Sequence, residues 1–179
     1  MTRILLAAGA SAALHKSCDL ASKLSQAGHE VRALLTKNAS RLISPQLFEA
    51  LTGQPAQVDE FGAERRGGMD HIELGRWAGL FVVAPCSADL LSRLALGLAN
   101  DLLTTAALVL EPSTPRFVAP AMNPKMLAAA PIQRNLATLR GDGWNVLEPG
   151  EGAMACGDEG AGRLMEPADI AEALRASLG

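Results

Sequence analysis

The stretch RILLAAGASAALHKSCDLASKLSQAG, residues 3–28, predicts a strand, a tight turn and a helix in immediate succession. RILLAA is short and almost entirely apolar, and it ends at Gly9. Apolar residues then recur at helical spacing until Gly28 ends the pattern, namely Leu14, Cys18, Leu20 and Leu24. A strand followed at once by a helix is the repeating unit of a parallel sheet.

The same alternation continues along the chain. Further short apolar runs predict strands at 31–36, 80–84, 116–119 and 144–147. Helical patterns lie between or beside them at 44–51, 88–96 and 131–140. Strands that are apolar on both sides indicate a parallel sheet covered by helices on both faces. We therefore predict a single α/β domain over residues 1–179, with a doubly wound, Rossmann-like (flavodoxin-like) parallel sheet. Glycine-rich stretches at 53–68 and 150–162 are expected to be loops.

Composition excludes several classes of protein. The 179 residues are 49% hydrophobic and 20% charged, which is enough apolar surface for a core. The net charge of −3 leaves no basic face for nucleic acid. The longest apolar run, 102–110, is too short to cross a membrane, and the N-terminus lacks the pattern of a signal peptide, so a cytoplasmic protein is expected. Three cysteines without a CxxC pair indicate reduced thiols, with neither a disulfide framework nor a metal site.

Ligands of doubly wound sheets bind beyond the carboxyl ends of the strands. The loops 9–11, 85–88 and 120–123, together with Thr36, are therefore expected to converge on one crevice. In the first loop, backbone amides and Ser11 suit an anion at a helix start, although a purely structural turn is equally compatible. In the second, Ser87 or Asp89 either caps the following helix or binds a ligand.

Three further positions carry candidate chemistry. His71 follows a glycine pair and has a side chain suited to proton transfer, but a lone histidine is more often structural or solvated. Asn123 lies between two prolines, which would orient its amide toward a carboxylate unless it only bonds to its own backbone. Residues 155–163, ACGDEGAGR, combine a thiol, glycines and an arginine, as a flap over an anionic ligand would, although a solvated turn is the alternative.

Four motifs together resemble the homo-oligomeric flavin-containing cysteine decarboxylases. This family includes phosphopantothenoylcysteine decarboxylases and decarboxylases of peptide natural products. The motifs are HIELGRWA at 71–78, APCSADLLSRLALGLANDLL at 84–103, PAMNPKM at 120–126 and ACGDEGAGR at 155–163. The resemblance spans nearly the whole chain, with the motifs in the family's order.

The resemblance implies FMN as cofactor and a specific assignment of roles. His71 and Cys156 correspond to catalytic residues of the family. Substrate contacts are implied for Asn123, Met126, Ala155, Gly157 and Arg163. Contacts with FMN are implied for Gly9, Ala10, Ser11, Thr36, Pro85, Cys86, Ser87, Ala88 and Met122. The family forms trimers, often assembled into dodecamers, with flavin at a subunit boundary.

The implied reaction is decarboxylation of a substrate that ends in a cysteine carboxylate. Flavin oxidises the thiol side to a thioaldehyde, carbon dioxide leaves, and an enethiol remains. Retention of Cys156 favours the coenzyme A reaction, in which the enethiol is reduced to 4′-phosphopantetheine. The alternatives are oxidative decarboxylation of a peptide's C-terminal cysteine, a non-catalytic FMN-binding regulatory subunit, and a flavin prenyltransferase.

The chain departs from the family pattern at two places. Residues 9–16 read GASAALHK where the family commonly has GGIAAYK or GSIAAYK, which alters the neighbourhood of the flavin. Leu127 stands where an aromatic residue often follows the PAMNPKM motif.

Overall fold

The computed structural model describes residues 1–59, 69–153 and 157–178. In these residues a five-stranded parallel sheet has the order β2-β1-β3-β4-β5. The strands are β1 (Arg3–Ala8), β2 (Glu30–Leu35), β3 (Leu80–Cys86), β4 (Arg116–Pro120) and β5 (Asn145–Val146). This is the strand order of the flavodoxin-like fold, so the predicted fold class is confirmed. Its topological switch point lies between β1 and β3.

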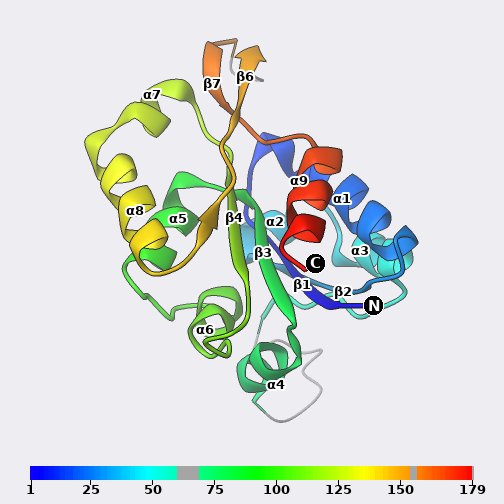
Figure 1. The fold of residues 1–179 in the computed structure, drawn as a ribbon. Coiled ribbons are helices and arrows are strands. Elements are labelled where there is room, and N and C mark those ends of the chain that lie inside the picture. The colour runs from blue at the N-terminus through cyan, green and yellow to red at the C-terminus, as the bar shows by residue number, and fades with distance from the viewer. Residues whose placement is uncertain (60–68, 154–156, 179) are drawn as a thin grey trace.

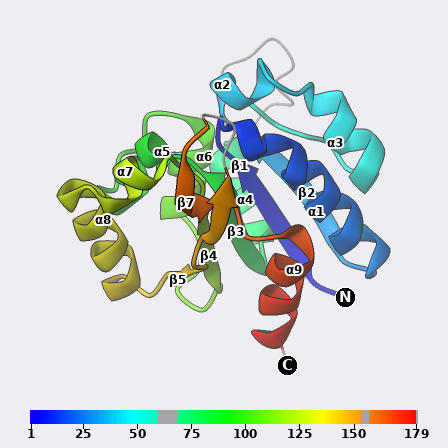
Figure 2. The ribbon, with the colours of Figure 1, turned by 90° about the horizontal axis from the view of Figure 1, so that it is seen from above.

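Helices cover both faces of the sheet (Figure 1, Figure 2). One face carries α1 (His15–Gln26), α3 (Pro45–Thr52) and α9 (Pro167–Ala176). The other carries α4 (Asp70–Trp77), α5 (Ala88–Ala95), α6 (Leu102–Leu108) and α8 (Ala130–Gly141). Three short helices follow strand ends, namely η1 (Ala12–Leu14), α2 (Lys37–Ser40) and α7 (Pro124–Ala128).

The strand β1 shows why the fold has two cores. Its side chains alternate between the faces, so Ile4 and Leu6 pack with α1 and α9, while Leu5 and Ala7 pack with the helices on the other face. All four of these residues are completely buried. A strand buried on both faces has no polar period, which is why it appears in the sequence as a continuous apolar run.

The predicted loop at 150–162 is wrong in part, because two strands form there. β6 (Gly150–Ala153) and β7 (Glu159–Arg163) make an antiparallel pair that projects beyond the main sheet (Figure 1). Gly152, Gly160 and Gly162 have φ angles of 131°, 143° and 138°, which side chains other than glycine rarely adopt. The glycines that suggested a loop therefore permit an unusual extended backbone.

Other differences concern lengths and missed helices. The strand predicted at 144–147 is reduced to Asn145–Val146. The apolar run at 102–110 contains α6, which begins with a capping box between Asp101 and Thr104. None of the helices in the described parts of the chain is long and apolar enough to cross a bilayer.

Candidate active site at the carboxyl ends of the strands

Backbone hydrogen bonds tie the predicted crevice loops together. The Gly9 N–H donates to the Pro85 carbonyl at 2.9 Å, which joins the ends of β1 and β3. The Thr36 N–H donates to the Ala8 carbonyl at 3.1 Å, and the Ala121 N–H donates to the Cys86 carbonyl at 2.9 Å. Four strand ends are thus held at one edge of the sheet, as the sequence predicts.

Four candidate residues cap the helices that leave this edge. The side-chain oxygens of Ser11, Thr36 and Ser87 accept backbone N–H groups of η1, α2 and α5 at 3.2, 3.1 and 3.3 Å. Asn123 Oδ1 accepts the Lys125 N–H of α7 at 2.8 Å. Ser87 therefore caps its helix, and Asn123 bonds to the nearby backbone through Oδ1 while its Nδ2 remains directed elsewhere. Capping places the amide ends of several helices at one edge, where partial positive charge favours an anion.

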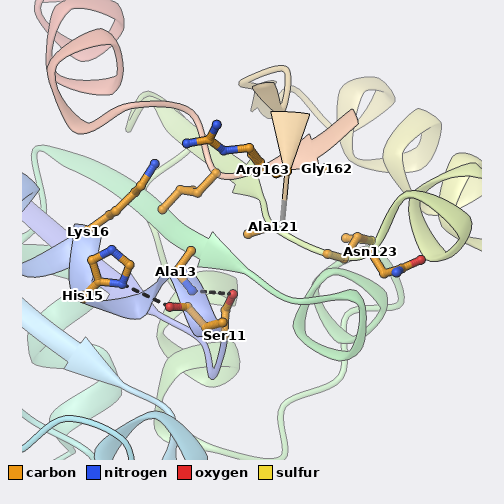
Figure 3. A pocket seen from close by; sticks show the side chains of 12 residues that line it. Ser11, Ala13, His15, Lys16, Ala121, Asn123, Gly162 and Arg163 are labelled. Carbon is orange, nitrogen blue, oxygen red and sulfur yellow. Dashed lines mark hydrogen bonds between the residues drawn. The ribbon is translucent and has the colours of Figure 1, made fainter. Parts of the chain in front are cut away.

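A cavity of about 440 Å³ opens at this edge (Figure 3). It lies between the start of α1, the loop after β4 and the strand β7. Four of the predicted site residues line it, namely Ser11, Met122, Asn123 and Arg163. The remaining lining residues are Ala12, Ala13, His15, Lys16, Ala121, Ala153, Gly162 and Leu164. The floor is largely apolar and the charged groups lie to one side, as is usual for small-molecule sites.

Close packing holds the first turn against the third strand. A Cβ on Gly9 would lie 3.0 Å from both the Pro85 carbonyl oxygen and Leu90 Cδ2, so a larger residue would push the two loops apart. The Ser17 hydroxyl donates to the Ala84 carbonyl at 2.7 Å. Cys86 is fully buried, and burial raises the pKa of its thiol, so this sulfur stays protonated and unreactive.

The hairpin of β6 and β7 is attached to the loop that carries Asn123. The Met122 N–H donates to the Gly162 carbonyl at 3.0 Å. Asn123 Nδ2 donates to a carboxylate oxygen of Asp158, just before β7 begins. At Gly160, a Cβ would meet Pro124 Cγ at 3.3 Å. The hairpin therefore closes one side of the cavity, and a carboxylate of the chain itself lies on the Asn123 amide.

Two cations on the opposite side share one carboxylate. Lys16 Nζ lies 2.6 Å from Glu166 Oε1, and Arg163 Nη2 lies 3.4 Å from the same oxygen. The hydrogen bond from Lys16, with the positive charges nearby, lowers the pKa of the Glu166 carboxyl. No sequence pattern pairs Lys16 with Glu166, because their contact joins residues 150 positions apart.

His71 is not brought to this cavity within one chain. It belongs to the first turn of α4, which lies at the opposite end of the molecule from β6 and β7 in Figure 1. The helix α4 packs mainly against α6. Of the other predicted residues, Met126 and Gly157 are exposed beside the hairpin, whereas Ala155 and Cys156 fall outside the described residues.

Comparison with known proteins identifies similar chains. The bifunctional coenzyme A biosynthesis protein CoaBC of Bacillus subtilis (strain 168) is 40% identical over 167 residues. The match covers 93% of this chain but only 41% of CoaBC, so the chain spans about two fifths of that protein.

Two solved structures match over nearly their full length. A mutant of PPC decarboxylase complexed with pantothenoylaminoethenethiol has 32% identity and a TM-score of 0.87, covering 99% of this chain and 98% of the other. The FMN-dependent cysteine decarboxylase SpaF has 29% identity and a TM-score of 0.82, covering 100% and 98%.

The model of the Flavoprotein family matches residues 1–179. Together with the full-length similarity to PPC decarboxylase, this match means that the chain belongs to the flavoprotein family, among the flavin-containing cysteine decarboxylases that its motifs resemble.

Proposed function

We propose that this protein binds FMN and decarboxylates 4′-phosphopantothenoylcysteine to 4′-phosphopantetheine, a step of coenzyme A synthesis. The observation that carries the proposal is the bond from Asn123 Nδ2 to the Asp158 carboxylate, because an amide that lines the cavity already bonds a carboxylate of the chain. The similarity to PPC decarboxylase over the whole chain, and to part of CoaBC, supports the same reaction.

The crevice suits a flavin mononucleotide in the chemistry of its groups. The capped helix starts after β1 and β2 offer amides for a phosphate, through Ser11 and Thr36. Beside them the cavity has an apolar floor that includes Ala121 and Met122, against which a ring system packs. The remaining proposed FMN contacts come from Gly9, Ala10 and residues 85–88. When bound, FMN supplies the two-electron oxidation of the cysteinyl side chain.

The residues of the chain then have distinct roles. Asn123 donates a hydrogen bond to the substrate carboxylate and fixes it until carbon dioxide leaves. His71 handles the proton that the cysteinyl group loses. Cys156 would act in the flap, where its thiol would assist return of the two electrons held by reduced flavin to the enethiol product. Around the substrate, contacts are proposed for Met126, Ala155, Gly157 and Arg163, and closure of the hairpin excludes water.

A homo-oligomer, trimeric or dodecameric, is required for this assignment. Because α4 and the hairpin lie at opposite ends of one chain, His71 is proposed to reach the Asn123 site of a second copy. Mixed oligomers test this directly. His71→Asn and Asn123→Asp subunits, each inactive alone, are expected to regain activity when refolded together. Mixed oligomers with no activity would contradict the shared site.

A second candidate function is oxidative decarboxylation of a peptide's C-terminal cysteine. It is favoured by the similarity to SpaF, which covers the whole of this chain. Cys156→Ser separates the two functions. In the coenzyme A reaction this variant is expected to release carbon dioxide but to accumulate the enethiol. Formation of the saturated thiol at the wild-type rate would remove the redox role of Cys156.

The proposed function is tested by carbon dioxide release from 4′-phosphopantothenoylcysteine labelled in its carboxylate. FMN-loaded protein is expected to release label, and protein stripped of flavin is not. Absence of release from the loaded protein would favour a non-catalytic FMN-binding subunit.

A further inference from the structure

The cation pair Lys16 and Arg163 lies in the cavity at a distance from the proposed carboxylate anchor. Figure 3 shows both side chains on one side of the cavity and Asn123 on the other, with Ala121 between them in this view. The proposed substrate also has two anionic ends, a carboxylate at its cysteinyl end and a phosphate at its other end. Each end could therefore meet one side of the cavity.

Burial differs across the ion pairs in a way that favours an incoming anion. The Lys16 side chain is only 18% exposed, whereas the Glu166 side chain is 55% exposed. Arg163 is intermediate, at 41%. The carboxylate that pairs with both cations is therefore the member that water reaches most easily, and it can turn outward while the two cations remain at the cavity.

Two positive charges face one negative charge at this position. A single carboxylate oxygen of Glu166 serves both Lys16 and Arg163, at 2.6 and 3.4 Å. The longer contact leaves the Arg163 guanidinium incompletely satisfied by Glu166. A phosphate monoester brings up to two negative charges and three acceptor oxygens, so it satisfies both cations better than one carboxylate does.

The geometry points to Lys16 and Arg163 as the subsite for the phosphate of the substrate, with Glu166 as the internal counter-ion that this phosphate displaces. The inference rests on the proposed function, since it assigns the far end of the same substrate. It makes the pair a specificity determinant that favours a phosphorylated substrate over its dephosphorylated analogue.

The phosphate of FMN is the other possible source of the same chemistry. The strand ends proposed to receive it include Thr36, which caps α2. In Figure 2, α2 and α9 lie on opposite sides of the view, and Glu166 directly precedes α9 without a side-chain capping bond. The cation pair shares its cavity with Ser11 but not with Thr36, so we assign it to the substrate and test the cofactor separately.

The test compares 4′-phosphopantothenoylcysteine with pantothenoylcysteine on FMN-loaded protein. Wild type is expected to prefer the phosphorylated compound in kcat/KM. Lys16→Met and Arg163→Met are expected to reduce that preference about 10- to 100-fold, the range for loss of a charge-assisted hydrogen bond. Lys16→Arg is expected to restore most of it. Lys23→Met is the matched control, because Lys23 lies on the same helix but pairs with Asp19.

Three results would overturn the inference. The first is an unchanged preference in both methionine variants. The second is an equal loss on both substrates. The third concerns the cofactor. If the methionine variants no longer bind FMN more tightly than riboflavin in fluorescence titrations, but still prefer the phosphorylated substrate, the pair would be assigned to the cofactor.

A binding measurement keeps this test separate from the proposed function. Titration of FMN-loaded protein with 4′-phosphopantothenate and with pantothenate requires no turnover. Tighter binding of the phosphorylated compound that depends on Lys16 would support the subsite even if no carbon dioxide is released. Equal binding of the two compounds would overturn the inference even if the decarboxylation occurs.

Discussion

The side-chain amide of Asn123 is bonded at both ends, from Nδ2 to the Asp158 carboxylate and at Oδ1 from the Lys125 N–H at 2.8 Å. One end fixes the orientation of the amide through the first turn of α7. The other end presents the donor to a carboxylate. The arrangement explains why an asparagine, and not an aspartate, suits a position that is proposed to receive a substrate carboxylate.

Asn123→Asp is expected to abolish turnover while FMN content stays unchanged. Aspartate retains the oxygen that caps α7, but it loses the Nδ2 donor and places a negative charge beside Asp158 and the substrate. We expect kcat/KM to fall at least about 100-fold, which corresponds to about 2.7 kcal/mol. The control is Asn135→Asp, because Asn135 Nδ2 donates to Ser92 Oγ at 2.9 Å and lies outside the cavity lining. Turnover retained by Asn123→Asp would reject the anchor assignment.

Asp158→Ala is expected to lower KM for the substrate. The Asp158 carboxylate occupies the Asn123 amide in the described structure, so the substrate carboxylate has to displace it. Removing this competitor should reduce KM about 3- to 10-fold, equivalent to about 0.7–1.4 kcal/mol. Steady-state kinetics measure the effect, and Glu159→Ala at the neighbouring exposed position is the control. A higher KM in Asp158→Ala would instead indicate that this carboxylate assists binding.

Asp101 is expected to make stability depend on pH. Burial alone would raise the pKa of its carboxyl, but hydrogen bonds from Thr104 and Arg93 outweigh burial and lower it. A lowered folded-state pKa contributes stability above the unfolded value of about 4 and loses it as pH falls through the folded value.

Urea unfolding of Asp101→Asn at two pH values measures this contribution. At pH 7 the variant is expected to lose about 1 kcal/mol of unfolding free energy relative to wild type, and the gap should close in strong acid. Asp19→Asn is the control, because the pair of Asp19 with Lys23 is exposed and contributes less than about 1 kcal/mol. If the difference in unfolding free energy between Asp101→Asn and wild type were the same in strong acid as at pH 7, ionisation of Asp101 would not contribute to stability.

Gly75→Ala is expected to destabilise the contact between α4 and α6. A Cβ at Gly75 would lie 2.6 Å from Val109 Cγ2 and 2.9 Å from the Val109 carbonyl oxygen. Overpacking of this kind costs about 1–3 kcal/mol. Gly141→Ala at the end of α8 meets no atom within 4 Å, so it should be neutral or stabilising by up to about 1 kcal/mol. Thermal unfolding of the two variants measures the difference. A higher unfolding temperature for Gly75→Ala than for Gly141→Ala would refute the packing argument.

The sheet could be predicted because its strands are largely apolar and end at or near glycine, proline or hydroxyl residues. The strands β1 to β4 follow from that pattern, and so does the convergence of the loops after them. The hairpin could not be predicted in the same way. Its strands contain glycines with positive φ, so neither the alternation nor the propensity of an ordinary strand is present in the sequence.

The site residues that belong to sequence motifs could be predicted. Contacts between residues far apart in the sequence could not. Asn123 and Arg163 were found through their motifs and do line the cavity. The pairing of Lys16 with Glu166 has no such signal, since Glu166 lies far along the chain and is brought close only by packing of α9 against α1. The proposed approach of His71 to the cavity of a second copy would depend on how copies of the chain assemble, which periodicity within one chain does not encode.

The most direct test of the proposed function is the mass of the product formed by FMN-loaded protein. Incubations run in parallel with 4′-phosphopantothenoylcysteine and with a peptide that ends in cysteine. The account predicts 4′-phosphopantetheine from the first and little reaction with the second. An enethiol from the peptide, with the phosphorylated compound unchanged, would contradict it and assign peptide modification instead.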